Sequence, residues 1–139
     1  IEEVLGKIKF IIFYLTTGTC AALSQAFLDP SSTIPMVGAS GAIAGILGAY
    51  IILFPKANIR VFFWFIIFFK IINIRAIYVL GFWIIIQLIS FSGTETNNGG
   101  VAYAAHIGGF ICGVILIYFL KGKIIQQNKL SKGSLPSSK

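Results

Sequence analysis

The sequence predicts an all-α fold of the membrane-embedded class, a polytopic bundle of transmembrane helices. Hydrophobic residues make up 57% of the 139 residues and charged residues only 11%, a balance well outside that of soluble globular domains. Four long apolar stretches recur along the chain, each close to the roughly 20 residues that a helix needs to cross about 30 Å of hydrocarbon. The basic residues fall outside these stretches.

The predicted spans follow one another with short polar segments between them. They cover residues 10–28, 37–54, 76–91 and 101–120. The third span is the shortest, and residues 71–75 can lengthen it, with their charged and polar members at the membrane surface. An aromatic run at residues 61–69 precedes it, but the nine residues between Arg60 and Lys70 are too few to cross a bilayer. We expect this run to lie on the surface or to re-enter from the cytoplasmic side, which gives four spanning helices plus an interfacial segment.

The charge distribution predicts the topology and argues against nucleic-acid binding. The formal net charge is +7, yet the basic residues form no single tract or helical face. They form three groups, before the first span, between the second and third spans, and after the fourth. If the four spans alternate in direction, all three groups lie on one side, the cytoplasmic one by the positive-inside rule. Loops 29–36 and 92–100 on the opposite side contain Asp29 and Glu95 but no Lys or Arg. We expect a multi-pass integral membrane protein of a bacterial plasma membrane, with residues 1–120 as the membrane domain and 121–139 as a disordered, basic cytoplasmic tail.

Two motifs of small residues open the second and fourth spans. They read Gly38-Ala39-Ser40-Gly41, followed by Gly45 and Gly48, and Ala105-His106-Ile107-Gly108-Gly109-Phe110, followed by Gly113. Glycines four residues apart are typical of membrane helices that approach each other closely. We expect such helix packing from Gly45, Gly48, Gly109 and Gly113.

Ser40 and His106 are the candidate catalytic residues. His106 is the sole histidine, and an ionisable residue within a span is costly and by default marks function. The alternative for His106 is a neutral imidazole that only packs between helices. Ser40 alone is a weaker indication of catalysis, because serine is frequent in membrane helices. Both residues, however, precede the cytoplasmic ends of their spans by the same number of residues. At about 1.5 Å per residue, both lie roughly 21 Å above that end, in the outer third of the bilayer.

This pair predicts nucleophilic catalysis. His106 can accept the proton of the Ser40 hydroxyl as the oxygen attacks a carbonyl, and can then pass it to the leaving amine. No Asp or Glu lies within the four predicted spans, which favours a Ser-His dyad over a triad. A helix start offers unpaired N–H groups and a positive dipole end to the oxyanion, with backbone support from Gly38, Ala39 and Gly41. Cys20 and Cys112 lie in apolar spans, where packing explains them, and we predict no disulfide, metal or cofactor.

The two motifs resemble, in this order and at a similar separation, the catalytic signatures of the rhomboid family of intramembrane serine proteases. The similarity covers about residues 2–120, including Asp29-Pro30, Phe54-Pro55 and the segment from Gly99 to Tyr103. The resemblance implies a six-helix core, Ser40 as nucleophile, His106 as general base and water reaching them from the outer face. It also implies transmembrane protein substrates that enter laterally beside residues 76–91.

Two family features are absent from this chain. A His and an Asn four residues apart on an earlier helix, which contribute to the oxyanion site in the family, are missing. The chain begins with Ile1 rather than Met, so we expect an upstream portion that contains two further core helices. Some relatives also carry an aromatic residue four positions after the nucleophile, where Ala44 stands here, so that aromatic support for the imidazole must come from elsewhere.

Two other functions compete with a protease. A non-catalytic rhomboid-like protein that binds or escorts membrane clients typically lacks the nucleophile or the histidine, and this chain has both. A transporter fragment would place its polar groups near the midplane of the bilayer, whereas Ser40 and His106 lie toward one face. We therefore predict an intramembrane serine endopeptidase whose partners are transmembrane substrates and the lipid bilayer.

Overall fold

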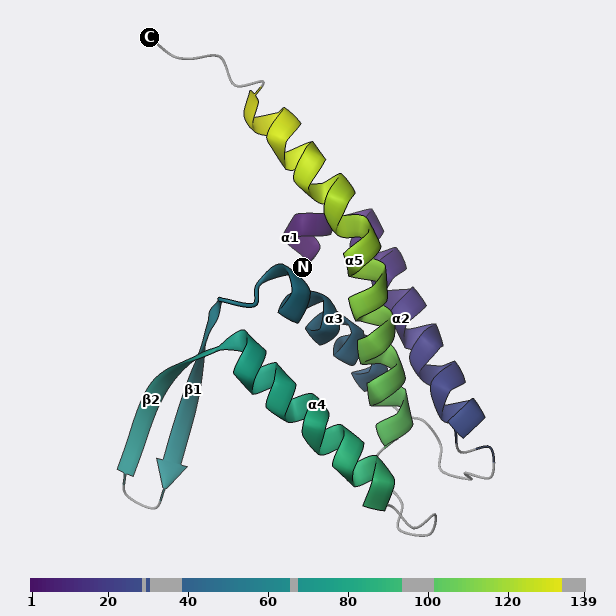
Figure 1. Cartoon of the computed structure of the whole chain (residues 1–139), viewed down its shortest axis with the longest axis vertical. Helices are drawn as coiled ribbons and strands as arrows, with labels where there is room; N and C mark the ends of the chain where they lie inside the picture. The colour runs from purple at the N-terminus through teal and green to yellow at the C-terminus, as the bar shows by residue number, and fades with distance from the viewer. Residues whose placement is uncertain (29, 31–38, 66–67, 94–101, 134–139) are drawn as a thin grey trace.

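The computed structural model describes residues 1–28, 30, 39–65, 68–93 and 102–133. Within these residues the chain forms five helices and one β-hairpin (Figure 1). In chain order the elements are α1 (Glu2–Leu5), α2 (Lys7–Leu28), α3 (Ser40–Leu53), β1 (Asn58–Phe65), β2 (Phe68–Arg75), α4 (Ala76–Gly93) and α5 (Tyr103–Gly133).

Helices α2, α3 and α5 form the packed body of the molecule. Their contact is made by small residues, because a Cβ atom on Gly113 of α5 would overlap the backbone of Gly45 in α3. A Cβ atom on Gly48 would likewise overlap the carbonyl of Phe110, and Gly45 also leaves room for the buried Thr17 of α2. In lipid there is no hydrophobic drive between apolar helices, so this backbone-to-backbone approach supplies the dispersion contacts that hold them together.

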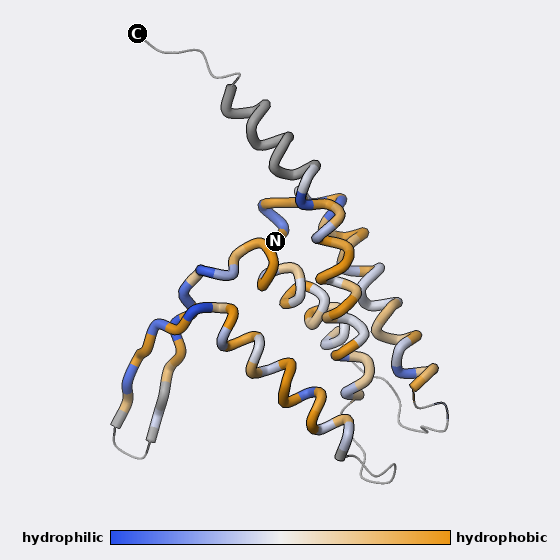
Figure 2. Tube along the Cα trace, viewed as in Figure 1, coloured by the Kyte–Doolittle hydropathy of each residue, from blue (hydrophilic) through white to orange (hydrophobic). Residues whose placement is uncertain are grey.

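The outward faces of the helices are apolar, as expected for a surface that meets lipid. Large hydrophobic side chains such as Phe27, Phe82 and Phe119 are mostly exposed, and Figure 2 shows hydrophobic residues recurring along the helices. Helix α2 and the Tyr103–Gly122 part of α5 are long and apolar enough to cross a membrane, whereas α3 and α4 are shorter apolar helices. Two of the four predicted spans therefore have the length and composition of membrane helices on their own.

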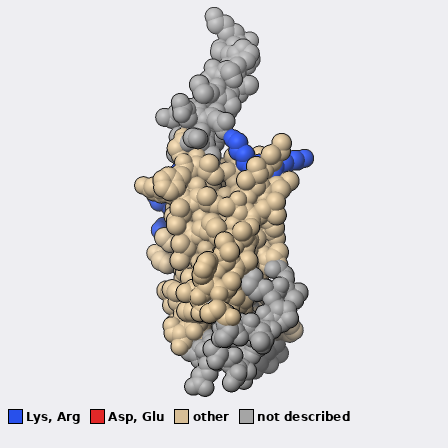
Figure 3. All heavy atoms as spheres, turned by 90° about the vertical axis from the view of Figure 1, so that its right-hand side faces the viewer, with Lys and Arg blue, Asp and Glu red and all other residues tan. Residues whose placement is uncertain are grey.

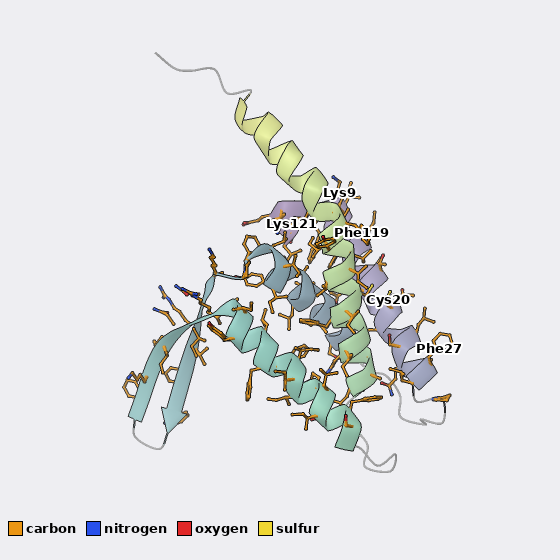
Figure 4. All side chains as sticks on the ribbon, in the orientation of Figure 1. Lys9, Cys20, Phe27, Phe119 and Lys121 are labelled. Atoms are coloured by element: carbon orange, nitrogen blue, oxygen red, sulfur yellow. The ribbon has the colours of Figure 1, made fainter. Side chains whose placement is uncertain are left out.

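The helices alternate in direction, and the basic residues follow this alternation. Helices α2 and α4 begin at the end of the molecule where α3 and α5 leave it (Figure 1). Lys9 and Lys121 lie at this end, and Phe27 lies toward the other (Figure 4). On the face shown in Figure 3, Lys and Arg gather in the upper part and along one edge. The predicted outer loops 29–36 and 92–100 lie largely outside the described residues.

Residues 58–75 correct the all-α expectation. Strands β1 and β2 pair antiparallel from Asn58 opposite Arg75 to Phe65 opposite Phe68. The segment is rich in β-branched and aromatic residues, which favour strands. Pairing of its two halves gives hydrogen bonds to backbone N–H and C=O groups, and the run of nine residues is too short to satisfy them as a membrane-spanning helix. Residues 71–75 therefore belong to β2 and do not lengthen the third span, since α4 begins at Ala76. The position of the hairpin at a membrane surface stays a prediction.

Helix α5 runs from Tyr103 to Gly133 and so continues past the apolar part of the chain. The division into a membrane domain of residues 1–120 and a disordered tail of residues 121–139 stays a prediction.

Candidate active site

Ser40 is the first residue of α3, and its side chain is exposed. The first intrahelical hydrogen bond runs from the N–H of Ile43 to the carbonyl of Ala39, at 3.0 Å. The N–H groups of Ser40, Gly41 and Ala42 therefore precede the helical ladder and have no acceptor within the helix. These donors and the positive end of the helix dipole lie beside the Ser40 hydroxyl, which suits a negatively charged oxygen. Of the predicted backbone support, Ala39 is exposed, Gly41 is buried and Gly38 lies outside the described residues.

His106 lies in the first turn of α5, where its side chain is half-buried. The start of this helix is tied to α2, because the N–H of Ala105 donates to Oε1 of Gln25 at 3.3 Å. The N–H of His106 donates to the carbonyl of Ala102 at 3.2 Å. A side chain from another helix thus satisfies one of the donors that a helix start leaves open, and fixes the backbone that carries the imidazole.

The imidazole of His106 has a partner that the sequence did not predict. Its Nδ1 lies 2.8 Å from Oε1 of Gln87, a buried residue of α4. An amide oxygen can only accept, so this contact favours the tautomer with the hydrogen on Nδ1, which in a neutral imidazole leaves the lone pair on Nε2. In the sequence, the one sign of this role is that Gln87 is the only amide side chain in the third predicted span. Its pairing with His106, 19 positions away, could be found only from the fold.

Trp83 supplies an aromatic ring beside the imidazole. Its ring centroid is 5.9 Å from that of His106 and 6.2 Å from that of Phe110. Trp83 and Gln87 are one helical turn apart and share one face of α4. The aromatic support that position 44 does not provide, where Ala44 is buried, therefore comes from α4.

The starts of α3 and α5 lie against each other at one level. A Cβ atom on Gly41 would lie 3.5 Å from the carbonyl oxygen of Ala105, and one on Gly109 would overlap the carbonyl of Gly41. Gly41 and Ala105, the direct sequence neighbours of Ser40 and His106, therefore lie about a methyl group's width apart. Within the described residues the Ser40 hydroxyl makes no hydrogen bond to His106, so the catalytic pairing of these two side chains stays a prediction.

Comparisons with known proteins point to the same family as the two motifs. The sequence profile of the Rhomboid domain matches residues 1–123. Rhomboid protein 1, mitochondrial, of Saccharomyces cerevisiae is 26% identical over 136 residues, which cover 93% of this chain and 36% of the yeast protein. The chain thus spans about a third of the length of this curated relative. No solved structure matches the chain significantly.

Proposed function

The chain belongs to the rhomboid family, and we propose that it is an intramembrane serine endopeptidase that cleaves transmembrane proteins with Ser40 as nucleophile and His106 as general base. The observation that carries this proposal is the close approach of Gly41 in α3 to Ala105 and Gly109 in α5, which leaves no room for a side chain on Gly109. It brings the starts of α3 and α5 together, with the only histidine of the chain and a serine next to the contact.

The reaction uses the free lone pair of the imidazole. Oγ of Ser40 attacks the substrate carbonyl carbon while its proton moves to Nε2 of His106. The oxyanion that forms accepts hydrogen bonds from N–H groups at the start of α3. Nε2 then delivers the proton to the amide nitrogen as the C–N bond breaks, which leaves an acyl ester on Ser40. Water, deprotonated by the same nitrogen, hydrolyses the ester and restores both residues.

The length of α3 supports a site within the bilayer. The helix has 14 residues, so at about 1.5 Å per residue its start lies roughly 21 Å from its end. With Leu53 at the cytoplasmic boundary, Ser40 lies below the opposite surface of a hydrocarbon layer about 30 Å thick. A transmembrane segment of a protein presents its backbone at this depth, which is why we propose transmembrane substrates.

The proposal places all of α2, α3, α4 and α5 across the membrane of a multi-pass protein. The predicted bacterial plasma membrane gains no support from the comparisons, because the yeast relative is mitochondrial by name. Fractionation of cells that express the tagged full-length protein identifies the membrane.

The test is mutation of each member of the pair in the full-length protein. Ser40→Ala and His106→Ala should each lower the rate of cleavage of a single-span substrate by several orders of magnitude, because nucleophile and base act as one unit. Ser92→Ala is the matched control, since the exposed Ser92 hydroxyl donates to the carbonyl of Leu88 in its own helix. The wild type and the control should also react with a fluorophosphonate probe.

Two results would contradict the proposal. Cleavage at the wild-type rate by Ser40→Ala would remove the enzyme assignment. A folded wild-type protein that neither cleaves nor reacts with the probe would favour the non-catalytic, client-binding alternative.

A further inference from the structure

We infer that Gln87 is a positioning residue of the proposed reaction, whose side-chain carbonyl fixes the tautomer and ring plane of His106. This inference rests on the proposed function. It also replaces the predicted two-residue group by three side chains from three helices, α3, α4 and α5.

The geometry of the contact supports this role. The Nδ1 to Oε1 distance of 2.8 Å lies at the short end of the range for N–H···O hydrogen bonds. Gln87 is only 7% exposed, so its amide is largely shielded from solvent. Every buried side-chain nitrogen and oxygen in the described part of the chain has a hydrogen-bond partner. A buried amide that must be satisfied, next to an imidazole that must be oriented, constrains both groups at once.

The tautomer is the chemical consequence. If Nδ1 donates to Gln87, Nε2 carries the lone pair and can accept the Ser40 proton. If Nδ1 had no acceptor, the hydrogen could reside on Nε2, and the base would then be a donor toward Ser40. Trp83, one turn before Gln87, lies beside the same ring and limits its rotation. The amide oxygen thus selects the reactive tautomer, and the indole restricts the plane.

A neutral amide suits this location better than a carboxylate. In soluble triads the carboxylate both orients the imidazole and stabilises its charged form. An ionised carboxylate within a span is costly unless it is paired. Gln87 provides orientation without that cost, and it provides no full charge, so its loss should cost less than the loss of a triad carboxylate.

Gln87→Met and Gln87→Glu separate positioning from packing. Met fills a similar volume and suits an apolar helix but accepts no hydrogen bond of comparable strength, whereas Glu keeps an acceptor oxygen at the same reach. Positioning predicts that Gln87→Met lowers kcat roughly ten- to a hundredfold with KM nearly unchanged, well below the roughly 10⁴-fold loss seen when a triad loses the correct tautomer. It also predicts that Gln87→Glu retains most of the activity. If Gln87 only filled space, Gln87→Met should retain more activity than Gln87→Glu.

The pH dependence gives a readout that packing would not move. A carboxylate beside the imidazole favours its charged form. The acidic limb of the kcat profile should therefore shift to higher pH in Gln87→Glu relative to the wild type. Imidazole ¹⁵N spectra of the full-length protein, assigned by difference against His106→Ala, should show the Nδ1–H tautomer in the wild type and a mixture in Gln87→Met.

Leu88→Met is the matched control, because it introduces the same residue at a half-exposed neighbouring position of α4 and should leave kcat and the tautomer unchanged. Wild-type kcat and tautomer in Gln87→Met, with Ser40→Ala inactive, would overturn the role of Gln87 and leave the protease intact. Activity in Ser40→Ala would instead remove the proposed function itself. Thermal unfolding of each variant identifies any loss that comes from misfolding.

Discussion

The N-terminal half of α5 meets α3 and α4 through contacts of different kinds. On the side of α3 the backbones touch, and Gly109 and Gly113 leave no room even for a methyl group. On the side of α4 the contact is made by long side chains, with Gln87 and Trp83 reaching across to α5. At Gly81, by contrast, α4 faces open space, since a Cβ atom there would meet no atom within 4 Å.

The difference indicates that α3 and α4 have separate roles in the proposed site. A contact between backbones permits one separation only, because any change of a few tenths of an ångström produces overlap or a gap. It can therefore set the distance between the elements that carry Ser40 and His106. A contact through side chains can open and close as its helix moves, so α4 can orient the imidazole while also forming the side by which a substrate enters.

The largest effect should come from adding one methyl group to the tight contact. Gly113→Ala would place a Cβ atom against the backbone of Gly45, which can only be relieved by separating α3 from α5. We expect a loss of about 1–3 kcal/mol in the free energy of unfolding. A displacement of about 1 Å at the site can also lower kcat by roughly a hundredfold. Unfolding and peptide cleavage by the full-length variant measure the two effects.

Gly81→Ala is the matched control for Gly113→Ala. The same methyl group enters open space on α4, and replacing a helical glycine by alanine should leave stability unchanged or raise it by up to about 1 kcal/mol. Equal destabilisation by the two substitutions would contradict the difference between the two contacts.

The sequence predicted the backbone contact between α3 and α5 better than the side-chain contact between α4 and α5. The four apolar stretches correspond to α2, α3, α4 and α5, because length and hydrophobicity are local properties, and the spaced glycines indicated close packing. The hairpin was missed because short apolar runs do not separate strand from helix, and pairing such as Val61 with Ile72 is a property of two segments. Gln87 was missed because a single amide has no pattern of its own, and its role depends on the position of another helix.

A smaller effect should come from removing the indole on the α4 side. Trp83→Ala takes away the ring beside His106 and Phe110, so the imidazole gains freedom while its hydrogen bond to Gln87 persists. An aromatic pair contributes about 0.5–1.5 kcal/mol, which corresponds to a decrease in kcat of up to about tenfold. We would measure kcat on a short soluble peptide, so that substrate entry through the lipid does not contribute. A decrease larger than that of Gln87→Met would make the ring, and not the amide, the main constraint on the base.

Helix α4, which we propose forms the side by which a substrate enters, should also affect that entry. Phe82 neighbours Trp83 but is 66% exposed, so Phe82→Ala reduces the bulk of α4 without touching the imidazole. We expect a rise of a few fold in cleavage of a single-span substrate, with little change for a soluble peptide, because only the former must pass α4. Equal changes for both substrates would argue for entry from the aqueous face.

The smallest effect should come from the anchor between α2 and the start of α5. Gln25→Leu removes the acceptor of the Ala105 N–H and keeps most of the side-chain volume. The net contribution of such a hydrogen bond is about 0.5–1.5 kcal/mol, and the glycine contacts with α3 are still present to hold α5. Stability should therefore fall by about 1 kcal/mol, and kcat by less than tenfold, as seen by thermal unfolding and peptide cleavage. Gln25→Glu keeps an acceptor oxygen and should restore most of both. If Gln25→Leu instead reduced kcat as much as Gly113→Ala, the α2 anchor would control the position of His106, and the α3 contact would not be the element that sets the distance.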